Sequence, residues 1–355
     1  MATIKSNTYS IVIGDNSLPS LHRFITKKNY SKYIIICDEH TLEKCLPTLL
    51  FHCPKLHEAE IIELESGEDK KNINTCMQVW GALTDIGADR KSLIINLGGG
   101  VVTDLGGFVA STFKRGIDFI NIPTTLLAMV DASVGGKTGI DFEGIKNHIG
   151  STQNPQAIYI NPEFLKTLDA RQIKNGYAEI IKIALITDKV FWSKLKKLKQ
   201  IDEFYTEEII TKAIQLKNKV VLTDFYEQHL RKSLNFGHSI GHALESALIQ
   251  QQKDILHGEA VIAGMYMESM IAHALKLISV KEKTEIQDYL KRLFKPITIS
   301  KKTKQSVLHF ITHDKKNEAG TLCFSLPKPV GKFQLYNGVA ITLVEEAIDA
   351  YIKLK

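Results

Sequence analysis

The stretch SLIINLGGGVVTD, residues 92–104, decides the fold class of this chain. Its first half is a short run of branched apolar residues without alternation, which is typical of a parallel strand buried on both faces. Gly98 to Gly100 follow, and a helical pattern begins at Val101. A strand, a glycine turn and a helix start leave free N–H groups at the positive end of the helix dipole. The stretch therefore predicts a turn that binds an anion.

The segments on either side repeat this alternation of strand and helix. We expect a helix over residues 72–87 and strands at residues 9–13, 33–37, 59–64, 92–97, 118–122 and 157–160. This alternation predicts an α/β fold, with a Rossmann-like nucleotide-binding domain over residues 1–162. Beyond it, residues 163–355 predict a mainly helical domain, with helices at 170–186, 206–222, 235–250, 258–277, 280–294 and 339–352 and a strand hairpin at 321–326 and 332–336.

The composition excludes several classes of protein. Of the 355 residues, 44% are hydrophobic and 24% charged, the balance of a globular protein rather than a disordered one. A net charge of +6 is too mild for this length to indicate nucleic-acid binding. No apolar run approaches the ~18–20 residues of a membrane span. The five cysteines form no CxxC pair and the N-terminus has no signal-peptide pattern, so we expect a cytoplasmic protein.

Glycines are concentrated in one part of the chain, with eleven of the 23 between Gly98 and Gly150. The run from Gly98 through Gly100 to Thr103 is only an approximate dinucleotide fingerprint, because it ends in Thr rather than Gly or Ala. A nucleotide site and a tight turn without a ligand both remain open. Asp104 is placed to accept hydrogen bonds from ribose hydroxyls, or to stabilise the helix start.

A second glycine segment, GGKT at residues 135–138, is similar to a P-loop but lacks its spacing, since Asp131 stands where the first glycine of that motif is required. This excludes a P-loop NTPase. We expect a flexible loop instead, which carries Lys137 and then Lys146 with Asn147. Lysines beside glycines suit an anionic ligand.

Histidines and one glutamate form a third pattern. His238 and His242 are four residues apart on one helical face, and His257 begins a later helix. Glu179 and Lys182 are one turn apart in an apolar segment, where they form either a buried ion pair or part of a site. Two histidines and one glutamate from separate helices would hold zinc with a position open for substrate, although the spacing leaves open which two histidines bind. The absence of HExxH from the sequence excludes a zincin protease.

Together these segments resemble the 3-dehydroquinate synthase family, of the sugar-phosphate cyclase group. The matching motifs occur in the expected order: GGGVVTD 98–104, PTTLL 123–127, DASVGGKT 131–138, KN 146–147, AEIIK 178–182, LNFGH 234–238, GHA 241–243, HGEA 257–260 and HDKK 313–316. The first 65 residues match only in general layout.

The resemblance implies a Rossmann-like domain joined to a mainly helical metal-binding domain, with NAD and one Zn²⁺, or Co²⁺, as cofactors. It also implies cyclisation of 3-deoxy-D-arabino-heptulosonate 7-phosphate, an anionic sugar phosphate, to 3-dehydroquinate with loss of phosphate, a step of the shikimate route to aromatic amino acids. The metal ligands would be Glu179, His238 and His257.

The resemblance further implies contact residues. NAD would contact Glu68, Lys71, Gly99, Gly100, Val101, Asp104, Thr124, Thr125, Lys137, Lys146, Phe164 and Thr167. Substrate would contact Asp131, Lys137, Lys146, Asn147, Lys182, Lys217, Arg231, Asn235, His242 and one of Lys315 or Lys316. Lys137, Lys217 and Arg231 would hold its carboxylate. Arg115 would complete the phosphate pocket of a neighbouring subunit, which implies a homodimer.

Three alternatives remain. A polyol dehydrogenase of the glycerol dehydrogenase type has a similar architecture, but a neutral alcohol needs none of these cationic positions. A related cyclase would act on sedoheptulose 7-phosphate or glucose 6-phosphate. A non-catalytic NAD-binding regulator would not need the set Glu179, His238 and His257.

Overall fold

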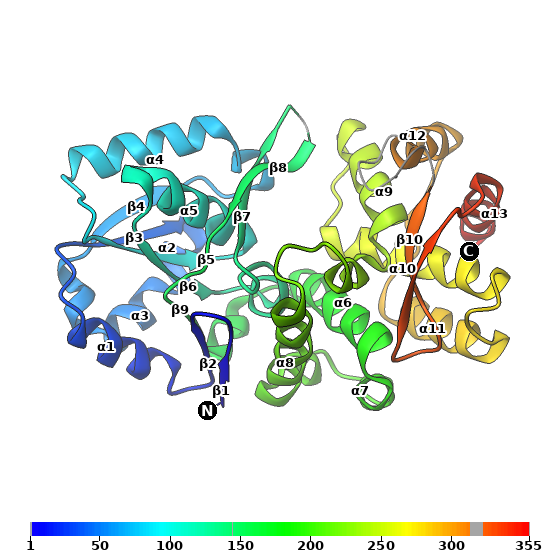
Figure 1. The fold of residues 1–355 in the computed structure, drawn as a ribbon, viewed down its shortest axis with the longest axis horizontal. Coiled ribbons are helices and arrows are strands. Elements are labelled where there is room, and N and C mark those ends of the chain that lie inside the picture. Colours follow the sequence, from blue (N-terminus) through cyan, green and yellow to red (C-terminus); the bar gives the residue numbers. More distant parts are fainter. Residues whose placement is uncertain (1, 144, 313–321, 355) are drawn as a thin grey trace. The chain divides into compact units, whose positions relative to one another are not determined.

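The computed structural model describes residues 2–143, 145–312 and 322–354 (Figure 1). The chain forms two compact units, one of residues 1–173 with 205–222, the other of residues 174–204 with 223–355. The first unit therefore includes a segment that follows the start of the second, and the chain passes between the units three times. The functional boundary expected after residue 162 stays a prediction.

In the described part of the chain, the first unit has a seven-stranded sheet of order β1-β2-β9-β6-β5-β3-β4, parallel throughout except for β1 with β2. Its strands are β1 Ala2–Lys5, β2 Ser10–Ile13, β3 Tyr33–Asp38, β4 Glu60–Leu64, β5 Leu93–Gly98, β6 Asp118–Pro123 and β9 Ala157–Ile160. The six predicted strands are confirmed. The strand Ala2–Lys5, which pairs with β2 at the edge of the sheet, was not predicted.

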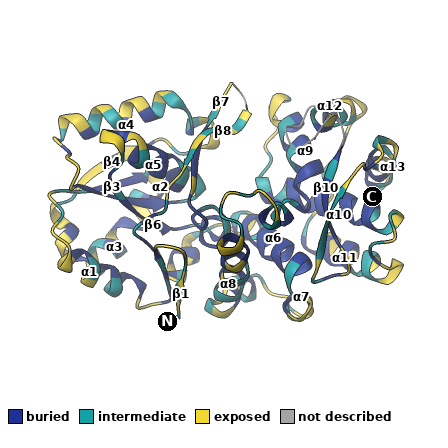
Figure 2. Ribbon diagram, viewed as in Figure 1, coloured by how far each residue is buried: buried dark blue, intermediate teal, exposed yellow. Residues whose placement is uncertain are grey.

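Helices cover both faces of this sheet, α4 and α5 on one face and α1 and α3 on the other (Figure 1). The helices of this unit, with short 3-10 or π-helical turns labelled η, have the following bounds: α1 Ser17–Lys27, α2 Glu39–Lys44, α3 Leu46–His52, η1 Pro54–Glu58, η2 Glu68–Lys70, α4 Ile73–Asp85, α5 Gly100–Thr112, η3 Phe113–Arg115, η4 Ala128–Ala132, η5 Pro162–Thr167 and α8 Glu207–Thr223. Every residue of β5 is buried (Figure 2), which explains its unbroken apolar sequence. The α/β class is confirmed.

The segment expected to be a flexible loop is instead an antiparallel hairpin, β7 Lys137–Phe142 and β8 Ile145–Thr152. That prediction is wrong because its glycines serve close packing rather than flexibility. Gly139 and Gly150 face each other across the hairpin, where a Cβ at Gly150 would lie 2.3 Å from the Thr138 carbonyl oxygen. The hairpin carries Lys137, Lys146 and Asn147 on a regular framework.

The second unit is mainly helical, as predicted. Its elements are α6 Ala170–Thr187, α7 Lys189–Leu195, η6 Ile201–Tyr205, η7 Leu230–Asn235, α9 His238–Gln250, α10 His257–Ala274, α11 Val280–Leu293, α12 Lys301–Thr312, α13 Ile341–Ile352 and the antiparallel pair β10 Cys323–Pro327 and β11 Phe333–Asn337. Helix α10 is buried along most of its length (Figure 2), so its apolar residues show no single face. Among the described helices, none is long and apolar enough to cross a membrane.

Candidate active site

Side chains from three helices of the second unit converge on one point. Glu179 comes from α6, His238 and His242 from the first turns of α9, and His257 from the first residue of α10. One ring nitrogen from each of the three histidines lies within 4.8 Å of the others. Glu179 Oε1 lies 3.6 Å from His238 Nε2 and 3.7 Å from His257 Nε2. The structure thus brings together the residues expected to hold a metal.

Hydrogen bonds on the far side of two imidazole rings set their orientation. His238 Nδ1 lies 3.1 Å from the Phe236 carbonyl oxygen, and His257 Nδ1 lies 3.3 Å from Glu245 Oε2. A carbonyl or carboxylate oxygen only accepts, so each Nδ1 carries the proton and donates. In the neutral rings each Nε2 then carries the lone pair, on the side of Glu179, which is the tautomer that a metal ligand needs.

Glu179 itself fits a cation. Its side chain is only 2% exposed, and among the described residues no donor makes a hydrogen bond to its Oε1. Its Oε2 forms an ion pair with Lys182. A buried carboxylate oxygen without a donor is costly, typically by ~1–3 kcal/mol. A divalent cation among Oε1 and the two Nε2 atoms would remove that cost, and this donor set suits zinc or cobalt.

The pKa of His257 reports the negative potential at this point. Burial alone would lower it, but attraction to the carboxylates of Glu179 and Glu245 outweighs burial and raises the pKa to about 10. The site therefore attracts positive charge strongly, whether a proton or a metal ion.

Buried polar side chains fix the ends of the helices that carry the histidines. The Glu268 carboxylate of α10 accepts the N–H groups of Gly237, at 2.6 Å, and Ile240, at 3.0 Å, at the start of α9. Asn175 Oδ1 of α6 accepts the N–H of Gly258, at 2.6 Å, at the start of α10. The start of each histidine-bearing helix is thereby tied to a neighbouring helix.

Glycines allow these helices to approach closely. A Cβ at Gly258 would lie 2.2 Å from the Asn175 carbonyl oxygen, and one at Gly264 would lie 1.9 Å from the Gly237 carbonyl oxygen. Gly237 also has a φ of +79°, a conformation that favours glycine. No larger residue fits at these contacts without moving one of the helices that carry Glu179 and the histidines.

The first unit contains the glycine turn, at the carboxyl ends of adjacent parallel strands. Gly99 is the N-cap residue of α5 and has no side chain that could cap the helix. The N–H groups in the first turn of α5 are therefore not used by a capping side chain. The Thr124 N–H, just after β6, donates to the Gly98 carbonyl oxygen at 3.0 Å. A Cβ at Gly99 would lie 3.1 Å from Thr125 Cγ2. The turn and both threonines therefore lie together, as a nucleotide site at this edge of a sheet requires.

Lys71 organises a cluster of charges near the start of α5. Its Nζ lies 3.0 Å from Glu68 Oε1, 3.4 Å from Asp104 Oδ2 and 2.9 Å from Asn147 Oδ1. Lys146 Nζ lies 3.5 Å from Glu68 Oε1. The structure thus brings these five predicted residues together. It adds Asp141, 3.6 Å from Lys71 Nζ, which the sequence did not single out.

Asp104 is a carboxyl group of this cluster whose pKa is strongly raised. Burial raises its pKa most, attraction to Lys71 opposes that change, and repulsion from Glu68 adds to it, so the pKa is raised to about 7. Lys71 is shared among three carboxylates and does not neutralise Asp104 fully. An ionisable group of this kind is common in ligand sites.

Three further predicted residues of the first unit have distinct surroundings. Lys217 of α8 is buried, and its Nζ lies 2.6 Å from Asp131 Oδ1 and 2.5 Å from the Asp131 carbonyl oxygen. Asp131 lies in η4, a single π-helical turn of the kind often found at functional sites. Arg115 is exposed and has a φ of +69°, directly after Lys114 at +49°.

The second unit contributes two buried cations, Lys182 and Arg231, which are 3% and 4% exposed. Arg231 Nη1 donates to the Phe225 carbonyl oxygen at 2.7 Å, and Asn235 Nδ2 donates to Glu227 Oε1 at 3.0 Å. Both residues lie in η7, which directly precedes α9. They are therefore close in sequence to the histidines of that helix.

Other predicted residues are less tightly placed. Phe164 and Thr167 follow β9, the strand beside β6, and Thr167 donates to the Phe164 carbonyl oxygen at 3.3 Å. Lys315 and Lys316 lie outside the described residues. The sequence analysis missed Asn175, Asp141, Glu245 and Glu268. Of these, Glu245 carried a signal, because it follows His238 by seven residues and His242 by three and so shares their helical face.

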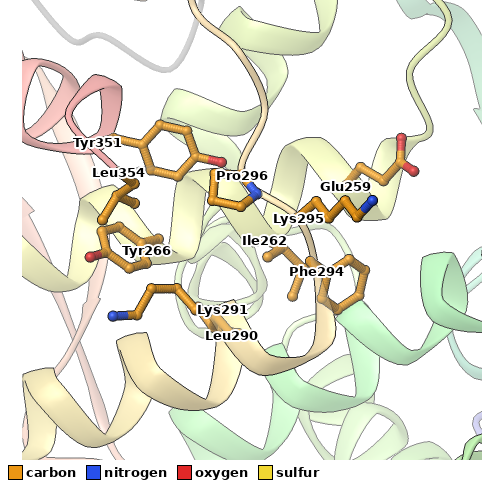
Figure 3. Close-up of a pocket in the computed structure, with 10 residues that line it drawn as sticks. All are labelled: Glu259, Ile262, Tyr266, Leu290, Lys291, Phe294, Lys295, Pro296, Tyr351 and Leu354. Carbon is orange, nitrogen blue, oxygen red and sulfur yellow. The ribbon is translucent and has the colours of Figure 1, made fainter.

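A small pocket on another flank of α10 is not the candidate site. It contains no histidine, and its lining is apolar and aromatic with a few charged ends (Figure 3). It is lined by Glu259, Ile262, Tyr266, Leu290, Lys291, Phe294, Lys295, Pro296, Tyr351 and Leu354.

Two family models match the chain in succession. Residues 61–175 match the N-terminal domain of 3-dehydroquinate synthase, and residues 176–317 match its C-terminal domain. A 3-dehydroquinate synthase from Parabacteroides distasonis is 39% identical over 343 residues, 96% of this chain and 97% of that protein. One from Helicobacter pylori is 40% identical and covers 98% of both chains.

Solved structures agree with these matches. A 2-deoxy-scyllo-inosose synthase complexed with carbaglucose-6-phosphate, NAD⁺ and Co²⁺ has a TM-score of 0.86 at 25% identity, over 98% of this chain and 99% of that one. A 2-epi-5-epi-valiolone synthase from Streptomyces hygroscopicus with NAD⁺ and Zn²⁺ has a TM-score of 0.83 at 27% identity, over 99% and 98%. A probable glycerol dehydrogenase from Sinorhizobium meliloti, at 12% identity and a TM-score of 0.62 over 99% and 98%, shares the fold alone.

Proposed function

Because the chain belongs to the 3-dehydroquinate synthase family, we propose that it converts 3-deoxy-D-arabino-heptulosonate 7-phosphate to 3-dehydroquinate and phosphate, with NAD and one divalent metal ion. The observation that carries the proposal is the convergence of Glu179 Oε1 with the Nε2 atoms of His238 and His257. Both similar cyclase structures contain NAD⁺ with Co²⁺ or Zn²⁺. Loss of phosphate by elimination makes the enzyme a carbon–oxygen lyase.

Two groups of residues would hold the cofactors. Glu179, His238 and His257 would hold Zn²⁺ or Co²⁺, and the glycine turn with Glu68, Lys71, Asp104, Thr124 and Thr125 would hold NAD. When bound, NAD supplies a reversible hydride acceptor and the metal ion supplies Lewis-acid polarisation of the substrate hydroxyls. The N–H groups at the start of α5 would bind the NAD diphosphate.

The cationic side chains would bind and orient the substrate. We assign Lys137, Lys217 and Arg231 to its carboxylate, and Lys182 with Asn147, Asn235 and His242 mainly to the region around its phosphate. Lys182, Lys217 and Arg231 are buried, so their attraction for an anion is less screened than that of surface lysines. These side chains would position the substrate and stabilise its negative charge. We assign the removal of the C6 proton to the substrate's own phosphate, which these groups would hold in place.

The proposal includes a homodimer in which Arg115 of one subunit completes the phosphate pocket of the other. It also includes a cytoplasmic location, for which the support is that all five cysteines, each within the described residues, are free thiols.

The deciding experiment compares two sugar phosphates at matched concentrations. Phosphate release should be rapid from the heptulosonate and slower by a factor of tens to thousands from sedoheptulose 7-phosphate, because a desolvated cation without its carboxylate costs ~2–5 kcal/mol. Absorbance at 340 nm should not rise with product, since hydride leaves and returns to the same carbon. Equal turnover of the neutral sugar would overturn the substrate assignment, and NADH accumulating in proportion to product would support a dehydrogenase.

A further inference from the structure

Glu245 is a buried carboxylate of α9 with no part in the proposed chemistry. It is 2% exposed, and its Oε2 lies 3.3 Å from His257 Nδ1. It belongs to the same helix as His238 and His242 but contacts the histidine of the next helix, α10. Glu245 therefore connects two of the helices that carry the proposed metal ligands.

This contact determines which ring nitrogen of His257 is available to bind a metal ion. Glu245 Oε2 accepts the Nδ1 proton of His257, so in the neutral ring the lone pair is at Nε2, 3.7 Å from Glu179 Oε1. A carboxylate on the far nitrogen also makes the imidazole a stronger donor to a metal ion than a neutral acceptor does.

The two proposed histidine ligands differ in how they are held. The His238 side chain is 9% exposed, and its Nδ1 donates to a backbone carbonyl oxygen, which the chain itself fixes. The His257 side chain is 23% exposed and begins its helix, so less packing restrains its ring. The backbone carbonyl oxygen of Phe236 orients the His238 ring, whereas the His257 ring needs a side chain to orient it.

We propose that Glu245 is a positioning residue of the metal site, which orients the His257 ring through Nδ1 and strengthens its Nε2 as a ligand. The inference rests on the proposed role of His257 as a ligand. It goes beyond that role because Glu245 itself does not touch the metal ion.

The test measures zinc affinity of the purified full-length protein by competition with a chromophoric chelator. Glu245→Ala should bind Zn²⁺ about 10–100-fold more weakly than the wild type. Glu245→Gln keeps an acceptor for the Nδ1 proton but loses the charge, so its loss should be smaller. The visible absorption of bound Co²⁺, which reports ligand geometry, should change more in the alanine variant than in the glutamine variant.

A double-mutant cycle with His257→Ala separates this inference from the proposed function. Once His257 is absent, Glu245→Ala should cost no further zinc affinity. If His257→Ala alone binds Zn²⁺ like the wild type, the ligand assignment fails. If His257→Ala loses zinc but Glu245→Ala and Glu245→Gln bind it normally, or if the effects of Glu245→Ala and His257→Ala add, the ligand stands and the positioning role is refuted.

Glu285→Gln is the matched control. Glu285 is a carboxylate of α11 in the same unit, and it accepts the Trp192 Nε1–H at 2.9 Å. Its variant should bind zinc like the wild type. Urea unfolding in the presence of a chelator checks each fold, and Glu245→Gln, which keeps the size of the side chain, still decides the question if Glu245→Ala fails to fold.

Discussion

Lys71 shows at the scale of one residue how the proposed nucleotide site is charged. Its ammonium is buried and faces the carboxylates of Glu68, Asp104 and Asp141. The carboxylates outnumber the cation, and attraction to them raises the pKa of Lys71 although burial alone would lower it. The Lys71 ammonium therefore stays charged. The group of this cluster whose pKa moves into the neutral range is a carboxyl group instead.

That carboxyl group is Asp104, and it predicts a pH dependence of stability. With a pKa of about 7 when folded against ~3.9 when unfolded, Asp104 binds its proton more tightly in the folded state. Its contribution to stability is full below about pH 4 and is lost as the pH rises through about 7. We expect the free energy of unfolding, measured with urea in the absence of NAD, to fall between about pH 4 and pH 7 in the wild type. It should fall less in Asp104→Asn, whose side chain cannot ionise.

The exposed Asp85 provides the control for this measurement. Asp85→Asn should follow the wild type across the same pH range. Parallel stability curves for the wild type and Asp104→Asn would show that Asp104 titrates as it does in the unfolded chain.

Arg231 predicts a loss of substrate binding without loss of cofactors. Arg231→Met should lower kcat/KM for the heptulosonate by a factor of tens to thousands, since it removes a buried cation that we assign to the substrate carboxylate. Arg231→Lys should fail as well, because a guanidinium offers two parallel bonds and an ammonium does not. Zinc content and NAD binding, by elemental analysis and calorimetry, should stay at wild-type values, and a variant that loses either would have a damaged fold instead.

At the scale of elements, the proposed metal site depends on how closely α6, α9 and α10 approach. Gly258→Ala should place a methyl group into the Asn175 carbonyl oxygen and separate α10 from α6, which carry His257 and Glu179. Such overpacking typically costs 1–3 kcal/mol or more. We expect a lower free energy of unfolding together with weaker zinc binding, measured by urea denaturation and chelator competition.

Gly81→Ala in α4 is the matched glycine control. Nothing lies within 4 Å of a Cβ there, and the residue is exposed on a helix. The substitution should stabilise the protein by about 0.5–1 kcal/mol and leave zinc binding unchanged. Wild-type stability and zinc affinity in Gly258→Ala would refute the close-approach argument.

For the whole molecule, the homodimer prediction is tested by mixing subunits. Arg115→Ala and Lys182→Met should each be nearly inactive alone. A mixed dimer would have one intact site, with Lys182 from one subunit and Arg115 from the other, so random pairing should restore about a quarter of wild-type activity. Differently tagged, co-expressed subunits show how much mixed dimer forms, and mixed dimers without activity would mean that Arg115 does not act across subunits.

Sequence reasoning was strongest where a period or a motif extended over many residues. The strands around residues 92–104 and the helices that carry Glu179, His238 and His257 were predicted within a few residues. It failed at the hairpin of Lys137 and Lys146, because the same glycines that suggest a loop also permit close packing of strands. It also missed Asn175 and Glu268, whose contacts with Gly258 and Gly237 join helices far apart in sequence, so no local pattern marks them.

The interleaving of the two units has a consequence for synthesis on the ribosome. The first unit includes residues 205–222, so it is complete only after α8 has been translated. At ~5–20 residues per second, 222 residues require roughly 10–45 s. During that time residues 174–204 of the other unit have also emerged, with apolar side chains whose partners on α9 to α11 do not yet exist. We therefore expect nascent chains to be most prone to aggregation, and most dependent on chaperones, during this interval.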